Sequence, residues 1–189
     1  MLYTRKGDNG TTKLFNCPQG TRVAKSDFVF EVLGSVDELN SIIGHAKVLA
    51  RNSGLTLCMN TGRVVYEEIL SLFQQVLFRI QAELGGSDIH PTHEDVLFLE
   101  EVVYEVEAVL PPIKSFVIPG GSVAGSYLDV CRTVARRVER GLVSLHERGD
   151  RNICAESIQY LNRLSSALYA LARFANYQEG NIEPAPTYK

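Results

Sequence analysis

The sequence predicts an all-α protein, folded as a five-helix up-and-down bundle with an extended N-terminal arm. Apolar residues recur at helical spacing nearly throughout the chain after the arm. The predicted helices, each roughly 20 residues long, are joined by short turns, as in antiparallel bundles. The 189 residues are 45% hydrophobic and no linker-like stretch divides them, so we expect one domain, 1–189. Within it we assign 1–34 to the arm, 35–178 to the bundle and 179–189 to a mobile tail.

The first two helices have readable start and stop signals. Ser35–Glu38 has the pattern of a capping box and predicts a helix over 35–51. A second helix is expected over about 61–84, where Gly85-Gly86 ends it. Residues 28–33 form the only credible strand, and it is short. The expected core faces of the two helices comprise Val36, Leu39, Ile43, Ala46 and Leu49, and Ile69, Phe73, Val76, Ile80 and Leu84.

The remaining three helices follow the same logic. A third begins at 92 or 93 and stops at Pro111-Pro112, because proline cannot continue a helix. A fourth follows the Gly-rich turn at 119–122 and carries several arginines. A fifth runs from about 152 past 175. The core faces of the third and fifth helices comprise Leu99, Val102, Val103 and Val106, and Ile158, Leu161, Leu164, Leu168 and Leu171.

The fourth helix stacks arginines along one side. With about 3.6 residues per turn, Arg132, Arg136 and Arg140 lie one above another, and Glu139 falls on nearly the same face. This side is a cationic surface of a size that suits phosphate. The side predicted to face the core carries Val130, Val134, Val138 and Leu142. A solvated ion-pair ladder with acidic neighbours such as Asp129 is the alternative interpretation of the same pattern.

A second element suited to anions lies at the N-terminus, in the segment Thr4–Lys13. Gly7 and Gly10 permit a tight turn that can point successive N–H groups at one anion, and neighbouring threonines add hydroxyl donors. The segment is not a Walker A loop, because no Gly-Lys-Ser/Thr triplet opens a helix there. An ordinary surface turn is the alternative.

Composition excludes several classes of protein. The net charge of −3 argues against a general nucleic-acid binder, whose positive charge should extend over the domain. We expect a cytoplasmic protein without membrane contact, because the chain has no run of 18 apolar residues and no secretory pattern at its N-terminus. The four cysteines lack C-x-x-C spacing, which favours reduced thiols over a disulfide framework or a zinc site.

Metal and nucleophile chemistry are poorly supported by the sequence. A di-iron carboxylate bundle needs Glu-x-x-His, and no glutamate here is followed by histidine at that spacing. His90, His93 and Glu94 could hold a metal, although they lie at a helix start where polar capping residues are common. We assign no metal-ligating residues. No Ser/His/Asp or Cys/His system is apparent either, so any catalysis must come from positioning.

Five segments together resemble the PduO-type ATP:cob(I)alamin adenosyltransferases. These segments are Tyr3–Thr12, Gly34–Asn40, Phe116–Ser122, Arg132–Arg140 and Tyr160–Ser165, in the order that the family has them. The resemblance implies a ferritin-like five-helix bundle that assembles as a homotrimer. It also implies active sites at subunit interfaces, each taking ATP with Mg²⁺ and a corrinoid as substrates. A client enzyme that depends on adenosylcobalamin is a further partner that the resemblance allows.

The resemblance also assigns roles to individual residues. The family's phosphate loop and its next phosphate-binding lysine match Thr4, Arg5, Lys6, Gly7, Thr12, Lys13 and Lys25. Its ATP-binding helix segment and its remaining ATP ligand match Arg136, Arg137, Glu139, Arg140 and Asn162, with Arg136 on phosphate and Glu139 on the nucleoside side. Asp37 and Arg132 resemble the pair that bridges neighbouring subunits beside the corrinoid. Phe116 matches the aromatic residue that crowds the lower face of cobalt.

The implied chemistry agrees with the lack of a protein base. Cob(I)alamin is itself a strong nucleophile, so attack on the 5′ carbon of ATP needs alignment and a stabilised triphosphate leaving group. By the resemblance, an apolar wall at Phe116 would make the cobalt easier to reduce. The chain departs from the family at Gln81, Asp129 and Ser166, and none of these is matched to ATP. A non-catalytic nucleotide-binding bundle and a purely structural bundle are the alternatives to an enzyme.

Overall fold

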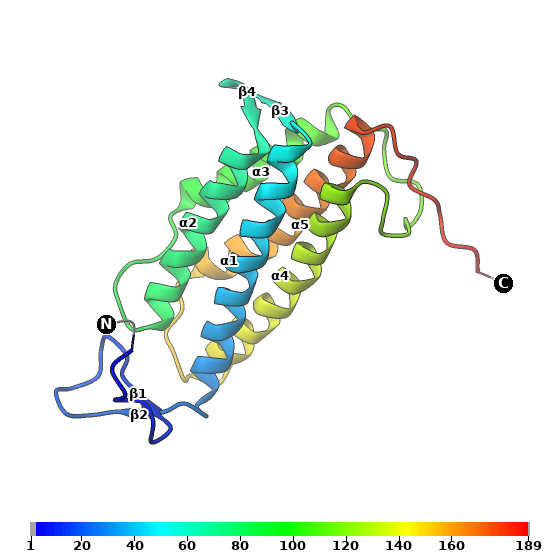
Figure 1. The fold of residues 1–189 in the computed structure, drawn as a ribbon. Coiled ribbons are helices and arrows are strands. Elements are labelled where there is room, and N and C mark those ends of the chain that lie inside the picture. Colours follow the sequence, from blue (N-terminus) through cyan, green and yellow to red (C-terminus); the bar gives the residue numbers. More distant parts are fainter. Residues whose placement is uncertain (1–2, 189) are drawn as a thin grey trace.

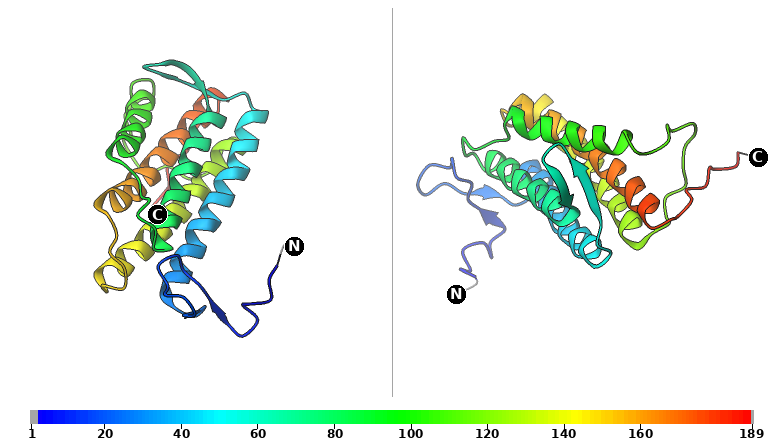
Figure 2. Two further views of the ribbon diagram at one scale, coloured as in Figure 1. Left: turned by 90° about the vertical axis from the view of Figure 1, so that its left-hand side faces the viewer. Right: turned by 90° about the horizontal axis from the view of Figure 1, so that it is seen from above.

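The computed structural model describes residues 3–188, and it confirms the all-α bundle. Its helices are α1 (Phe28–Asn52), α2 (Tyr66–Leu84), α3 (His93–Glu107), α4 (Val123–Glu147) and α5 (Ala155–Gln178). The helix α1 packs against α2 and α4, and α5 packs against α4 and α3 (Figures 1 and 2). Neighbouring helices therefore follow the order α2, α1, α4, α5, α3. The bundle also brings α2 to α5, because the Tyr66 hydroxyl donates to the Leu171 carbonyl at 3.2 Å. These neighbours decide which residues can share a site.

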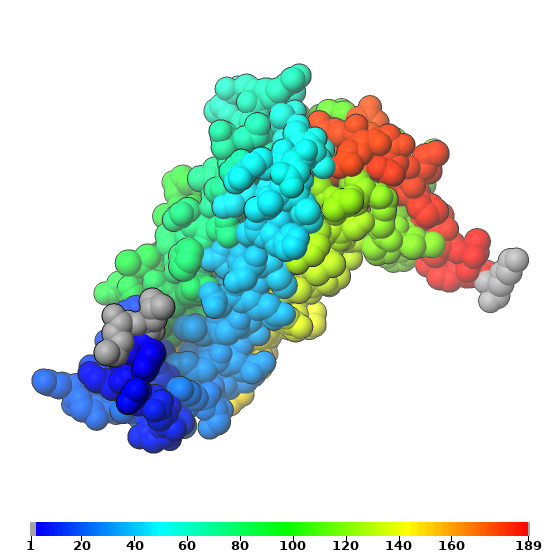
Figure 3. Space-filling model, viewed as in Figure 1, coloured from blue at the N-terminus to red at the C-terminus, as the bar shows by residue number. Residues whose placement is uncertain are grey.

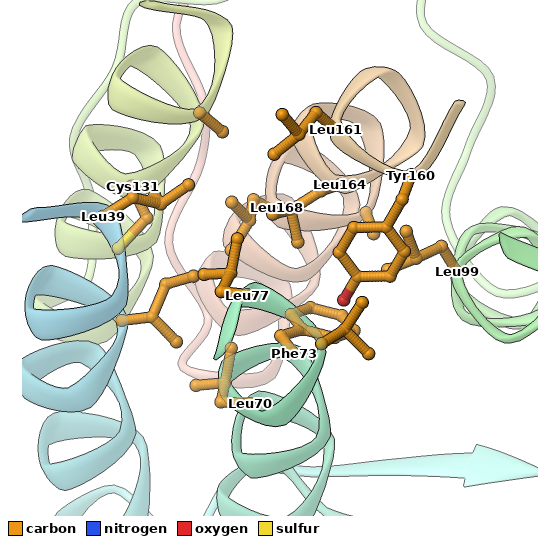
Figure 4. Packing of buried hydrophobic residues seen from close by; sticks show 14 of the residues in the cluster. Leu39, Leu70, Phe73, Leu77, Leu99, Cys131, Tyr160, Leu161, Leu164 and Leu168 are labelled. Atoms are coloured by element: carbon orange, nitrogen blue, oxygen red, sulfur yellow. The ribbon is translucent and has the colours of Figure 1, made fainter. Parts of the chain in front are cut away.

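The core draws side chains from all five helices. Figure 4 shows Leu39 of α1, Phe73 of α2, Leu99 of α3 and Cys131 of α4 converging on leucines of α5. All four are fully buried, with no exposed surface. Burying a side chain of the size of leucine or phenylalanine stabilises a fold by about 1.5–3 kcal/mol relative to leaving it exposed. The core therefore fixes the helix faces that remain outside it.

The helix α1 begins earlier than the sequence predicted, and the strand assigned to 28–33 is wrong. The side chain of Asp27 accepts a hydrogen bond from the N–H of Val29 at 3.1 Å and caps the helix. Val29, Val32 and Val36 are buried at helical spacing, so packing against the bundle overrides the preference of β-branched residues for strands. Ser35 is not a cap, because its hydroxyl donates to the Glu31 carbonyl at 2.8 Å inside the helix.

The second helix begins later than predicted, because residues 61–65 belong to a β-hairpin. Strand β3 (Thr56–Met59) pairs antiparallel with β4 (Gly62–Val65), with Met59 opposite Gly62. Gly62 has a φ of 116°, a conformation that glycine adopts without strain. Leu55, Leu57 and Met59 are buried, so the hairpin closes one end of the core. The predicted helix over about 61–84 thus included the residues of β4, which form a strand instead.

The later helices lie close to their predicted positions. The helix α3 begins after Thr92, which forms a capping box with Asp95, and it ends before Pro111. The prediction for the inner face of α4 is wrong at Val130, which is 45% exposed. Cys131 and Ala135 are buried in that region instead. Successive residues of an α-helix are 100° apart, so a row of residues spaced by four slowly turns around the helix. The predicted row therefore leaves the core at its N-terminal end, at Val130.

The two ends of the chain flank the bundle. The N-terminal arm contains a two-stranded ribbon, β1 (Thr11–Thr12) with β2 (Val23–Ala24), and lies beside the start of α1. The segment that follows α5 lies on the other side of the molecule (Figure 3). Among residues 3–188, no helix is long and apolar enough to cross a membrane.

Candidate functional site

The N-terminal loop is closed by a lysine that directly follows the strand β2. The Nζ of Lys25 donates to the Gly7 carbonyl at 3.0 Å, and the Lys25 backbone N–H donates to the Gly10 carbonyl at 2.9 Å. A Cβ on Gly7 would lie 3.0 Å from that Nζ, so the contact favours glycine there. Arg22 holds the opposite strand through the Thr11 hydroxyl at 2.7 Å. These contacts bring the predicted phosphate lysine to the predicted phosphate loop.

A groove of about 710 Å³ opens beside this loop. Its polar wall includes Thr12, Lys13 and Lys25, three of the residues predicted to hold phosphate. Its apolar wall comes from α1 and α2 and includes Phe30, Leu33 and Phe78, with Gln81 alongside. Thr4, Arg5 and Lys6 are exposed in the turn that leads to the groove, and Arg5 has a φ of 59°. The arm thus provides a cationic rim over an apolar floor.

A second cavity, of about 330 Å³, lies between α4 and α5. Arg136, Glu139, Arg140 and Asn162, four of the residues predicted to bind ATP, line it together. The Nδ2 of Asn162 donates to the Glu139 carboxylate at 2.9 Å, and Arg140 donates to the Arg136 carbonyl at 3.0 Å. Arg137 is not part of this group, because it forms an ion pair with Glu38 on α1. Arg137 therefore lies on a different face of α4 from Arg136 and Arg140.

A third cavity, of about 590 Å³, contains Phe116. It lies between the loop that precedes α4 and the α4 and α5 helices, and Arg132, Arg136 and Tyr169 line it as well. Phe116 is 80% exposed, so its ring is available to a ligand. Arg136 lines both this cavity and the one that holds Glu139 and Asn162. One guanidinium therefore joins the two cavities.

Arg132 and Asp37 do not meet within one chain. Arg132 forms an ion pair with Asp129, three residues before it on α4, and lies over the Tyr169 ring at 5.7 Å from the centroid. Burial raises the pKa of the Tyr169 hydroxyl. Asp37 is exposed on α1, where Gln81 of α2 approaches its carboxylate at 3.4 Å. The predicted Asp37–Arg132 pair therefore requires a second copy of the chain.

The phosphate loop and the arginine helix are also apart within one chain. The groove beside the loop is bounded by the arm, α1 and α2, whereas the other two cavities are bounded by α4, α5 and the loop before α4. No residue that the structure describes lines both the groove beside the loop and either of the other two cavities. A single chain carries two halves of the predicted nucleotide site without joining them.

Sequence reasoning missed Tyr169 and Lys114, both of which line the Phe116 cavity. A signal for Tyr169 was present, because Asn162, Ser166, Tyr169 and Arg173 recur at helical spacing along one side of α5. Lys114 lies in a loop without periodicity, so only the folded chain places it.

The three residues considered as an alternative metal site do not gather into a centre in the part of the chain that the structure describes. His90, His93 and Glu94 surround the start of α3, and within residues 3–188 no group of three histidine, cysteine or acidic side chains is placed to hold an ion. Hydrogen bonds from a backbone N–H and from the Thr92 hydroxyl lower the pKa of Glu94. The cysteines are free thiols, and burial raises the pKa of Cys131 to about 12. Such a buried thiol is unreactive at neutral pH.

Comparison with known proteins decides the family. A model of the family described as cobalamin adenosyltransferase matches residues 2–175. The chain belongs to the cobalamin adenosyltransferase family. Among the relatives of this adenosyltransferase chain, a corrinoid adenosyltransferase of Citrobacter freundii is 36% identical over 179 residues, covering 91% of the chain and 93% of the relative. The human corrinoid adenosyltransferase MMAB is 35% identical over 192 residues, covering 96% and 71%.

Other relatives are longer than the adenosyltransferase domain that they share with this chain. The PduO protein of Citrobacter freundii is 37% identical over 180 residues, which are 91% of this chain and 49% of that protein. The chain thus spans about half the length of that relative.

Solved structures agree with the family assignment. A variant of the PduO-type ATP:corrinoid adenosyltransferase of Lactobacillus reuteri, complexed with cobalamin and ATP, has a TM-score of 0.82 and 28% identity. That match covers 98% of this chain and 96% of the other. A second variant, also complexed with cobalamin and ATP, has a TM-score of 0.84 and 29% identity, with full coverage of both chains.

Proposed function

We infer that this chain transfers the 5′-deoxyadenosyl group of ATP to the cobalt of a reduced corrinoid. In that reaction the cob(I)alamin electron pair forms a Co–C5′ bond, the C5′–O bond breaks, and triphosphate leaves with its electrons. The observation that carries the assignment is the shared wall at Arg136, where the cavity that contains Phe116 meets the cavity that contains Glu139 and Asn162. A nucleotide in one cavity would then lie next to a corrinoid in the other.

The arginine helix would orient ATP and stabilise its leaving group. In this proposal Arg136 contacts phosphate, and Glu139 with Asn162 contacts the nucleoside side. The hydrogen bond between Glu139 and Asn162 supports a shared task, because it holds both polar groups at one place on the α4–α5 surface. Arg140 adds positive charge on the same face. Preorganised donors of this kind act on charge that develops in the transition state.

The arm would hold the triphosphate from the other side. Lys13, Lys25 and the loop amides supply positive charge and N–H donors around the groove. The preceding turn adds Thr4, Arg5, Lys6 and Gly7. Mg²⁺ prefers phosphate and water oxygens to an all-protein cage, so we propose that it enters with ATP.

We propose that the active site forms between subunits of a homotrimer. The separation of the arm groove from the α4–α5 cavities within one chain supports this arrangement. The positions of Asp37 and Arg132 support it as well. Asp37 lies on α1, whereas Arg132 lies on α4 and forms its ion pair with Asp129. In the assembly, Asp37 of one subunit would approach Arg132 of the next. A cytoplasmic location and a client enzyme remain predictions.

Phe116 would form the wall on the lower face of the corrinoid. Its exposed ring, with the Tyr169 ring in the same cavity, offers apolar surface that excludes water from cobalt. Loss of water and of a lower axial ligand would make the cobalt easier to reduce.

The decisive test follows adenosylation directly. Purified protein, MgATP and chemically reduced cob(I)alamin are mixed without oxygen, and the visible spectrum is followed for the adenosylated product. We expect Arg136→Ala to lower kcat by about 10²–10³, as removal of one transition-state donor does. Arg148→Ala, which changes an arginine paired with Asp150 at the end of the same helix, is the matched control and should keep its rate.

The alternative is a nucleotide-binding bundle without cobalt chemistry. Under that alternative, ATP would raise the melting temperature of the protein while no adenosylated product forms. A protein that converts cob(I)alamin without ATP dependence would also contradict our proposal.

A further inference from the structure

The loop that carries Phe116 has no regular structure of its own, yet it must hold that ring in place. Residues 108–122 connect α3 to α4 outside the helices. Phe116 and its neighbours Ser115 and Pro119 are exposed, so the core does not fix them. The contacts that do fix the loop come from the end of α5 and from the chain that follows it (Figure 1).

The first of these contacts is the amide of Asn176, near the end of α5. This side chain is 5% exposed. Its Oδ1 accepts from the N–H and from the hydroxyl of Ser122, both at 2.9 Å, and its Nδ2 donates to the Gly120 carbonyl at 3.1 Å. A Cβ on Gly121 would lie 2.8 Å from the same oxygen. One buried amide therefore sets the end of the loop and the first turn of α4.

The second contact is a segment of the chain beyond α5. The Nδ2 of Asn176 also donates to Glu183 at 3.2 Å, and the Glu183 carboxylate pairs with Arg173 of α5 at 2.8 Å. The two charged side chains are only 14% and 15% exposed. The backbone N–H of Ile118, two residues after Phe116, donates to the Pro184 carbonyl at 2.8 Å. The mobile tail predicted from the sequence is thus tied to the bundle at 181–184.

We propose that Glu183 is a positioning residue for the Phe116 loop. The Arg173–Glu183 pair fixes residues 183–184, and the Pro184 carbonyl then holds Ile118, which sets the place of Phe116. This inference deepens the proposed function, because it rests on Phe116 facing the corrinoid. The arm and the Glu139–Asn162 pair lie outside this chain of contacts, so we assign it to the corrinoid half of the site.

The charge and burial of the pair support a positioning role. When one partner of a mostly buried ion pair is removed, the local structure is strongly destabilised, because the other charge stays buried without compensation. Arg173 lies one turn beyond Tyr169 on the same side of α5, and both line the cavity next to the Phe116 cavity. Loss of Glu183 should therefore loosen the loop and leave the helices in place.

The test combines a structural readout with a kinetic one. We expect Glu183→Ala to speed hydrogen exchange of the Ile118 amide, and trypsin cleavage after Lys114, by at least about tenfold. The KM for the corrinoid should rise severalfold while the KM for ATP stays the same. Glu179→Ala is the matched control, because it removes a carboxylate from the same segment, and its side chain has no ion pair with the residues the structure describes.

The structural readout decides the proposal even if the protein proves not to transfer adenosyl groups. Exchange and cleavage that match the parent would overturn it, and so would equal increases in the two KM values. Should Glu183→Ala fail to fold, Glu183→Gln retains the shape of the side chain and should give smaller changes of the same sign. Arg173→Ala combined with Glu183→Ala should loosen the loop no more than the worse single variant, because both act on one pair.

Discussion

Single residues in this protein hold together parts that are distant in the sequence. Arg136 joins the two cavities between α4 and α5. Asn176 contacts the Gly-rich turn through three hydrogen bonds, and the helix α4 approaches it so closely that only glycine fits at 125. A Cβ there would lie 2.2 Å from the Asn176 Oδ1 and 2.9 Å from the Ala172 carbonyl oxygen. Such contacts leave no space for an added methyl group.

We therefore expect Gly125→Ala to lower the free energy of unfolding by about 1–3 kcal/mol, the usual cost of overpacking. Gly141→Ala, in the same helix, is the matched control. Its Cβ would lie 3.4 Å from Val32 Cγ2, an ordinary contact, so it should raise stability by about 0.5–1 kcal/mol. Urea unfolding with an unchanged m-value measures both. Equal effects of the two substitutions would contradict the close packing at Asn176.

At the scale of elements, the start of α1 is set by a cap that sequence patterns obscured. Ser35–Glu38 has the residues of a capping box, but it lies about two turns inside a helix that begins after Asp27. Local signals at both places are similar in strength, and burial of Val29 and Val32 decides between them. Helix type and order were predictable because core faces recur over many residues. Helix ends were harder to predict, because the signal of a single cap residue can be overridden by tertiary packing.

Substitution can separate the two candidate caps. Asp27→Ala removes the acceptor for the Val29 N–H and should cost about 1 kcal/mol of stability. Ser35→Ala should cost nothing and can stabilise, because a serine that bonds back to the Glu31 carbonyl within a helix gains little. The melting temperatures of the two variants measure the difference. A larger loss from Ser35→Ala would place the helix start where the sequence first indicated it.

At the scale of the whole molecule, the candidate site is divided between two surfaces. The sequence predicted the members of each half, because glycine spacing and stacked arginines are local patterns. It could not show that the halves are separate, since that depends on the arm packing beside α1 and α2 while the arginines lie on α4 beside α5. Lys114 and the separate direction of Arg137 likewise follow from packing alone. The division is the basis for the proposed interface between subunits.

Mixing two inactive variants tests that interface. Lys13→Ala damages the arm groove and Arg136→Ala damages the α4–α5 cavities. If each site takes its arm from one subunit and its arginine helix from the next, random mixed trimers restore about a quarter of the sites. Adenosylation should therefore reappear after the two variants are unfolded and refolded together. No recovery, with trimers formed, would place both halves of a site in one subunit.

The contact between Pro184 and Ile118 also makes the Phe116 loop depend on residues that follow the last helix. All five helices precede residue 179, so the helices do not include residues 181–184. The hydrogen bond at the Ile118 amide, in contrast, needs Pro184. A chain cut at about residue 180 should therefore fold and bind the nucleotide while its Phe116 loop is left without that anchor. Proteolytic trimming behind α5 would then remove corrinoid binding before it affects ATP binding.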